Sequence, residues 1–420
     1  MLARVAMAAA APECPGGDRV RLTALARWEN EGGADALAVG ARKPSVVGKV
    51  GQAPGRGAMP SPVQDLKDLG QSLWLDNLTR RILDDGTLSD YVDTFGITGL
   101  TSNPTIFDEA IGSSDAYDRG IEEKSALGKS GEALFFELAL EDLRRAAQLF
   151  RPEFQATAGI DGWVSIELSP LLAFDTAGSI AAAAQVHAQA AIANLLIKIP
   201  GTPAGLAAIE ESIYDGIPVN VTLLFSAGQY LDAAQAYLRG IERRIAAGRD
   251  PGVGSVASLF VSRWDKAGNG ELPPRLRNRL GIAVAQRTYR TYRELLASPR
   301  WQALAAAGAQ PQRLLWASTG SKDADAPDTL YVDSLAAADT INTMPEKTLH
   351  AFADHGTAAA GMPIDGGDCE VTLDQIASAG VDIDRLAERL QREGAASFVA
   401  SWKQLLQRVA EKAHAASAAR

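Results

Sequence analysis

The chain has 420 residues, of which 46% are hydrophobic, and its formal net charge is −10 at pH 7. No apolar run approaches the roughly 20 residues that span a bilayer, so we expect no membrane protein. The negative charge also argues against nucleic acid or an anionic membrane surface as the main partner, but not against a small anion bound by a few local cations.

Residues 1–60 differ from the rest of the chain. They are rich in Ala, Gly, Pro and Arg and lack sustained periodicity, so we predict a disordered N-terminal extension. The first residues faintly resemble a signal peptide, but their apolar core is short and dominated by alanine. Alternatively, these residues are no secretion signal because the given start is over-extended and the protein begins nearer Met59. We expect residues 61–420 to form a single folded domain.

From Gln71 onward, short apolar runs alternate with helical stretches. Runs of this length and composition are typical of strands that are buried on both faces. Eight of them separated by helices favour a closed parallel (β/α)8 TIM barrel over an open sheet. The predicted strands are Ser72–Asp76, Ile97–Asn103, Trp163–Leu168, Leu195–Pro200, Pro218–Phe225, Ser255–Ser262, Arg313–Ser318 and one within Tyr331–Thr343.

Capping signals predict the helices between these strands. Thr202-Pro203 begins one helix and Gly216 ends it, and Ser226 begins another that runs to about Gly248. A long amphipathic helix is expected over Arg275–Ala297. After Pro345 we expect several additional C-terminal helices packed outside the barrel, including Asp382–Glu393 and Ala395–His414.

A lysine lies inside one of the predicted strands. Lys198 is part of the run Leu195–Pro200, where burial disfavours a charged amine. A neutral lysine amine is a nucleophile that can form a Schiff base with a carbonyl substrate. Alternatively, the side chain reaches out of the strand end or pairs with a buried carboxylate. The segment alone leaves these readings open.

Polar residues recur at the carboxyl ends of the predicted strands, where a barrel builds its active site. Each has a structural alternative: Asp76 could cap a helix over Asn77–Leu83, Asn103 could be an ordinary turn residue, and Glu167 could be the structural partner of Lys198. Together they are hard to explain as packing, because uncompensated buried polar groups cost free energy. The set comprises Asp76, Asn103, Glu167, Lys198, Asn220, Thr222, Ser258 and Arg263.

Cofactor signatures are missing from the sequence. The four histidines are scattered, and His350 and His355 are five apart, which is the wrong interval for one helical face. No GxxxxGKS/T loop and no GxGxxG after a strand occurs, so we predict neither a metal nor a nucleotide cofactor. Two cysteines, Cys14 and Cys369, suggest no structural disulfide, which fits a reducing cytoplasm.

Five of these strand-end segments, in order and with compatible spacing, closely resemble transaldolases of the longer bacterial branch. The similarity runs from about Leu66 to near the C-terminus. It implies a cofactor-free enzyme of the pentose phosphate pathway that moves a dihydroxyacetone unit between sugar phosphates through a lysine Schiff base. The segments read LWLD (73–76), TSNPT (101–105), VSIE (164–167), IKIP (197–200) and NVTLLFS (220–226).

The resemblance also implies catalytic roles for individual residues. Lys198 would form the Schiff base with the C2 carbonyl of a ketose phosphate, and Asp76 would take the proton from its C4 hydroxyl. Glu167 and Thr222 would hold a water that shuttles protons. Asn103 and Asn220 would hydrogen-bond the hydroxyls of the dihydroxyacetone unit.

The phosphate of the substrate needs cations and donors. Ser258 and Arg263 match the family's phosphate segment, and an arginine fork suits a phosphate. Where the family carries a second arginine, Lys322 follows the seventh strand of this chain; it is either a substitute point charge or a surface lysine. Phe260 lies where related aldolases tend to carry a tyrosine, and with Glu167 it favours transfer over simple cleavage.

Two other function classes compete with a transaldolase. A lysine-dependent aldolase on the same barrel would differ by needing no acceptor. A non-catalytic barrel would be expected to lack Lys198, Asp76 or Glu167, and all three are present. We expect sugar-phosphate substrates as partners, and the sequence leaves monomer and homodimer open.

Overall fold

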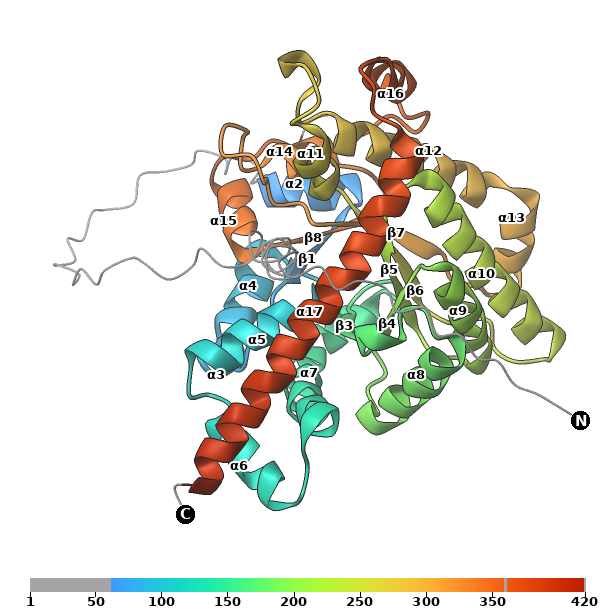
Figure 1. Ribbon diagram of the computed structural model, residues 1–420. Coiled ribbons are helices and arrows are strands. Elements are labelled where there is room, and N and C mark those ends of the chain that lie inside the picture. Colours follow the sequence, from blue (N-terminus) through green and yellow to red (C-terminus); the bar gives the residue numbers. More distant parts are fainter. Residues whose placement is uncertain (1–61, 359–360, 419–420) are drawn as a thin grey trace, which may run out of the picture.

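The computed structural model describes residues 62–358 and 361–418; the extension predicted over residues 1–60 lies outside them. Eight parallel strands form a closed barrel in chain order, with β8 paired to β1 (Figure 1). The TIM barrel prediction is therefore confirmed. The strands are β1 (Ser72–Asp76), β2 (Gly99–Thr101), β3 (Val164–Glu167), β4 (Leu195–Pro200), β5 (Val219–Leu224), β6 (Ser255–Phe260), β7 (Gln312–Ala317) and β8 (Thr340–Met344).

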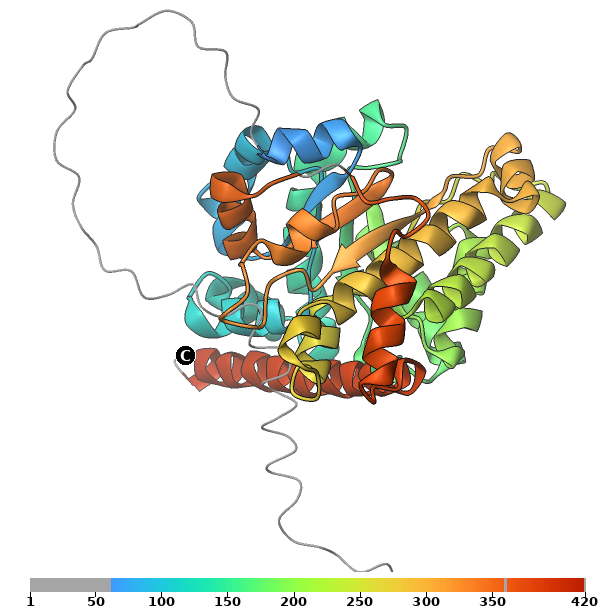
Figure 2. The ribbon, with the colours of Figure 1, turned by 90° about the horizontal axis from the view of Figure 1, so that it is seen from above.

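Helices surround the barrel and connect its strands (Figures 1 and 2). In the first half they are α2 (Pro62–Leu69), α3 (Arg80–Asp84), α4 (Thr87–Phe95), α5 (Pro104–Ser113), α6 (Asp118–Ala126), α7 (Gly131–Ala156), η1 (Pro170–Leu172), α8 (Thr176–Ala190) and α9 (Pro203–Asp215). In the second half they are α10 (Ala227–Ala246), α11 (Ser262–Gly268), η2 (Pro274–Leu276), α12 (Leu280–Ala297), α13 (Pro299–Ala306), α14 (Leu330–Ser334), α15 (Glu346–His355), α16 (Cys369–Ser378) and α17 (Ile383–Ala418). No helix in these two described ranges is both long and apolar enough to cross a membrane.

The strands read as apolar runs because both of their faces are buried. Every residue of β4 and β5 is buried, for example. Alternate side chains point into the barrel and fill it, while the others pack against the helices. The inner cluster consists of Trp74, Trp163, Leu196, Val256, Leu315, Ala317 and Ile341.

An ion pair closes the amino end of the barrel. Asp161, just before β3, lies 3.5 Å from a guanidinium nitrogen of Arg313 in β7. The same carboxylate accepts hydrogen bonds from Trp74 Nε1 at 2.8 Å and from Thr98 Oγ1 at 2.8 Å. These bonds pair the charges that burial would otherwise penalise. The candidate site residues lie at the opposite, carboxyl end.

Several predicted boundaries are confirmed. Thr202 is the N-cap of α9 and accepts a hydrogen bond from the Gly205 amide, and Gly216 ends this helix in the left-handed region. Ser226 likewise caps α10. Such caps satisfy backbone groups that a helix end leaves open, so they are readable from local sequence.

The eighth strand, predicted within Tyr331–Thr343, is confirmed at the end of that range and extends one residue beyond it, to Met344. Two predictions about helices were wrong. The helix expected over Asn77–Leu83 begins at Arg80 with Thr79 as its N-cap, so Asp76 caps no helix. The two helices expected after residue 382 form one helix of 36 residues, α17, because it continues through Gly394.

The helix α17 crosses the carboxyl end of the barrel, diagonally in Figure 1 and along one edge of the molecule in Figure 2. Gln391 Nε2 donates to the carbonyl oxygens of Gly201 and Leu223, each at 3.0 Å. Leu223 lies at a register shift between β5 and β6 and has a φ of 57°, a region that favours glycine. Gln391 thus holds an irregular strand end next to β4.

We expect the substitution Gln391→Met to lower the free energy of unfolding by about 1–3 kcal/mol, because it removes the donor to two buried carbonyl groups. Urea denaturation monitored by circular dichroism would measure this. The exposed Gln407→Met on the same helix is the control and should leave stability unchanged. Equal stability of the two variants would contradict this role of Gln391.

Candidate active site

Strand register brings three of the predicted residues into one layer. Glu167 is aligned with Lys198 across β3 and β4, and Lys198 is aligned with Asn220 across β4 and β5. Aligned residues of neighbouring parallel strands point to the same face. All three side chains therefore lie at the same level of the barrel interior, near its carboxyl end.

Lys198 is only 7% exposed. Its Nζ donates to the carbonyl oxygen of Ser102 at 2.8 Å and lies 3.4 Å from Glu167 Oε2. The alternative in which the Lys198 side chain reaches out of the strand end is thus wrong, whereas the alternative in which it pairs with a buried carboxylate is observed. The pairing does not compete with nucleophilic chemistry, because an adjacent carboxylate can accept and return the amine's proton.

Glu167 also contacts the next strand but one. Thr222 Oγ1 in β5 donates to Glu167 Oε1 at 3.4 Å. Lysine, glutamate and threonine are therefore linked across β3, β4 and β5. The glutamate and the threonine can exchange protons with a water or an alcohol held between them. Carbonyl addition and dehydration require such proton exchange.

Asp76 ends β1 on another side of the barrel. It accepts a hydrogen bond from Thr101 Oγ1 at 2.7 Å, and this hydroxyl also lies 2.7 Å from Thr343 Oγ1 in β8. Thr101 and Thr343 were missed in the sequence, although both are polar residues at carboxyl ends of strands. Their hydroxyls fix the orientation of the Asp76 carboxylate.

Asn103 and Asn220 have structural partners that limit their roles. The Asn103 side-chain oxygen accepts from the Ile106 amide at 3.1 Å and caps α5, so any hydroxyl would be bound through its Nδ2. Asn220 Oδ1 accepts from Ser258 Oγ at 2.7 Å, and its Nδ2 lies 3.5 Å from Ser165 Oγ. Ser258 therefore orients Asn220.

The other predicted substrate contacts follow β6 and β7. Arg263 lies in α11 and is 6% exposed, and Lys322 lies in the partly exposed loop after β7. The two segments touch through the hydroxyls of Ser262 and Ser318, which are 2.9 Å apart. Phe260 ends β6 with its ring centroid 5.4 Å from that of Phe225.

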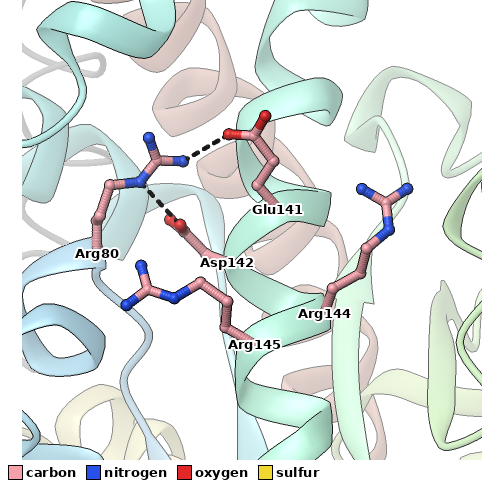
Figure 3. A pocket seen from close by; sticks show the side chains of 5 residues that line it. All are labelled: Arg80, Glu141, Asp142, Arg144 and Arg145. Carbon is pink, nitrogen blue, oxygen red and sulfur yellow. Dashed lines mark hydrogen bonds and ion pairs between the residues drawn. The ribbon is translucent and has the colours of Figure 1, made fainter.

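A separate hollow lies outside the barrel, beside α7 (Figure 3). Both of its carboxylates are paired with Arg80, which donates to Asp142 at 2.9 Å and to Glu141 at 3.0 Å. It contains neither a nucleophile nor any residue of the barrel interior, so we assign it a structural role. Its lining residues are Arg80, Glu141, Asp142, Arg144 and Arg145.

Comparison with known proteins decides the family. The family model described as transaldolase/fructose-6-phosphate aldolase matches residues 73–409. The chain belongs to this family. A transaldolase of Thermobifida fusca is 43% identical over 363 residues, covering 84% of this chain and 99% of the relative.

Other curated transaldolases agree with this assignment. A transaldolase of an Arthrobacter strain is 44% identical, with 83% of this chain and 96% of the relative covered. One of Neisseria gonorrhoeae is 41% identical, with 82% and 98% covered. The resemblance that the strand-end segments suggested is therefore confirmed. In the parts of this transaldolase-family chain that the structure describes, no three His, Cys, Asp or Glu residues are grouped so as to hold a metal ion.

A buried carboxyl group lies two residues after Arg263. Asp265 is 1% exposed, and burial raises its pKa to about 6, against the opposing effect of hydrogen bonds from Tyr331 and the Gly281 and Leu280 amides. In the unfolded chain the pKa is near 3.8. The stability contributed by this group is thus fully present below pH 3.8 and is lost as the pH rises through 6.

The amide of Asp265→Asn never becomes charged, so the difference in free energy of unfolding between this variant and wild type should shift in favour of the variant by roughly 2–3 kcal/mol as the pH rises from 4 to 7, whatever its value at pH 4. Urea denaturation at both pH values would measure the difference. Asp374→Asn, at an exposed position on α16, is the control. A constant difference between Asp265→Asn and wild type at both pH values would refute the expectation.

Proposed function

We propose that this chain is a transaldolase of the non-oxidative pentose phosphate pathway. It would transfer a dihydroxyacetone unit from sedoheptulose 7-phosphate or fructose 6-phosphate to glyceraldehyde 3-phosphate or erythrose 4-phosphate. The observation that carries the proposal is the buried Lys198, 3.4 Å from Glu167 at the carboxyl end of a barrel. The family membership restricts which Schiff-base chemistry this pair performs.

In the first step, the Lys198 amine attacks the C2 carbonyl of the ketose phosphate. The carbinolamine that results must lose water to give a protonated imine, which requires a proton at the departing hydroxyl. Glu167 and Thr222 would hold the water that relays this proton, a role that their 3.4 Å contact supports. The protonated imine is itself an electron sink, so this route requires no metal or organic cofactor.

In the second step, the Asp76 carboxylate takes the proton from the C4 hydroxyl. The C3–C4 bond breaks, its electrons enter the imine, and an aldose phosphate leaves while the enamine stays on Lys198. The enamine then adds to the aldehyde of the acceptor, and Asp76 returns its proton to the new C4 oxygen. Water hydrolyses the resulting imine, which releases the product ketose phosphate and the Lys198 amine. The hydrogen bond from Thr101 keeps the carboxylate in one orientation for both transfers.

Substrate binding would use the remaining strand ends. Asn103 and Asn220 would bind hydroxyls of the dihydroxyacetone unit, with Ser258 holding Asn220 in place. Arg263, Ser258 and Lys322 would bind the phosphate, Arg263 through its two-pronged guanidinium and Lys322 as a point charge. We further propose a cytoplasmic monomer or homodimer in which residues 61–420 act as a single catalytic domain.

The transfer reaction tests this function directly. With fructose 6-phosphate and erythrose 4-phosphate, we expect the wild-type protein to form sedoheptulose 7-phosphate and glyceraldehyde 3-phosphate. Lys198→Met should abolish this, and Asp76→Asn should lower kcat by about 10²–10⁴-fold, because it removes a general base. A coupled assay of glyceraldehyde 3-phosphate measures both.

The control for these variants is Lys403→Met, which removes an exposed lysine on α17 and should retain full activity. Activity that survives in Lys198→Met would refute the proposed nucleophile. A wild-type protein that produces no sedoheptulose 7-phosphate would refute the transferase.

Phe260 and Glu167 distinguish transfer from simple cleavage. A phenyl ring carries no hydroxyl to activate water against the imine, so without an acceptor we expect little free dihydroxyacetone from fructose 6-phosphate. Phe260→Tyr should raise this release, which an enzymatic dihydroxyacetone assay measures, while Phe174→Tyr at a 64% exposed position should not. Wild-type release as fast as transfer to erythrose 4-phosphate would contradict the proposal.

A further inference from the structure

Arg263 is carried by a segment that cannot fix its own position. The helix α11 has only seven residues, too few for a stable isolated helix. Its place must therefore be set by what its neighbours bind. Figure 1 shows α11 close to α12 and α14.

Asp265 fastens α11 to the start of α12. Its Oδ1 accepts from the Leu280 amide at 3.0 Å, and both of its oxygens lie within 3.3 Å of the Gly281 amide nitrogen. These amides are the first two of α12, whose own N-cap residue, Arg279, provides no side-chain cap. Asp265 thus serves as the missing cap from another segment.

The approach of the two helices is close enough to require a glycine. A Cβ on Gly281 would lie 2.6 Å from the Val261 carbonyl oxygen and 2.8 Å from Asp265 Oδ2. Real Cβ atoms do not approach backbone oxygens so closely, so a side chain here would push α11 away. The distance between α11 and α12 is therefore set by this contact.

Tyr331 completes the junction from α14. Its hydroxyl donates to Asp265 Oδ2 at 2.8 Å, and it is 2% exposed. A buried carboxylate needs all of these donors, so loss of one weakens the junction. Residues two apart on a helix do not face each other, and Asp265 therefore acts on Arg263 through the backbone.

The loop after β7, which carries Lys322, is also hydrogen-bonded to the start of α12. Asn278, two residues before α12, donates from Nδ2 to Asp323 Oδ2 at 2.8 Å. Asp323 directly follows Lys322. The start of α12 thus holds both segments that would bind the substrate phosphate.

We propose that Asp265, together with Tyr331, is a positioning residue for phosphate recognition: it locks the Arg263 segment to α12 and thereby sets the affinity for phosphorylated substrates. The proposal rests on the proposed function, in which Arg263 binds phosphate. It assigns no contact between Asp265 and the substrate.

The test compares Tyr331→Phe and Asp265→Asn with wild type at pH 7.5. We expect KM for fructose 6-phosphate and Kd for inorganic phosphate, by calorimetry, to rise about tenfold, with kcat changed by less than about twofold. Borohydride trapping of the imine formed with dihydroxyacetone, which carries no phosphate, should proceed at the wild-type rate. A purely structural role would slow this trapping as well.

Tyr117→Phe is the matched control. Tyr117 donates to the buried Asp142 at 2.9 Å outside the barrel, so its loss should lower Tm without changing KM. A phosphate Kd in Tyr331→Phe within twofold of wild type, or equal slowing of dihydroxyacetone trapping, would overturn the inference. The measurements on Tyr331→Phe decide the inference even if Asp265→Asn fails to fold. A wild-type protein without transfer activity would instead overturn the proposed function.

Discussion

The constraint on which the structure depends is the burial of the Lys198 amine inside the barrel. Burying a charge is costly unless it is paired, and Lys198 meets this requirement with Glu167 at 3.4 Å and the Ser102 carbonyl at 2.8 Å. A closed barrel supplies these partners from neighbouring strands, because its register places aligned side chains at one level. The same neighbours that make burial tolerable are the groups that can move protons to and from a carbonyl adduct.

The rest of the fold keeps this end of the barrel in shape. The amino end is closed by the buried pair of Asp161 and Arg313, so the interior has polar chemistry at both ends and an apolar layer between them. At the carboxyl end, Gln391 on α17 holds the irregular end of β5 beside β4. Asp265 holds α11, the helix after β6, against the start of α12. Rigid partners, rather than the short strands themselves, define the site geometry.

Much of this could be predicted from local sequence. The bounds of β1 and β4 follow from apolar runs, and α9 follows from Thr202 and Gly216, because these signals lie within a few residues of the element they define. The strand-end positions of Asp76, Glu167 and Lys198 followed from the same pattern. Their partners did not: Thr343 meets Thr101 from 242 residues away, and Gln391 meets Gly201 from 190 residues away. Such contacts depend on how distant segments come together in the fold, and they leave no periodic signal. The single helix α17 was likewise missed because its packing outweighs the helix-weakening effect of Gly394.

Imine formation by Lys198 can be measured directly. The most direct measurement is borohydride reduction in the presence of fructose 6-phosphate, followed by peptide mapping by mass spectrometry. We predict one dihydroxyacetone-derived adduct per chain, located on Lys198. A stoichiometric adduct on any other lysine, or no adduct in protein that is turning over substrate, would contradict this role of Lys198.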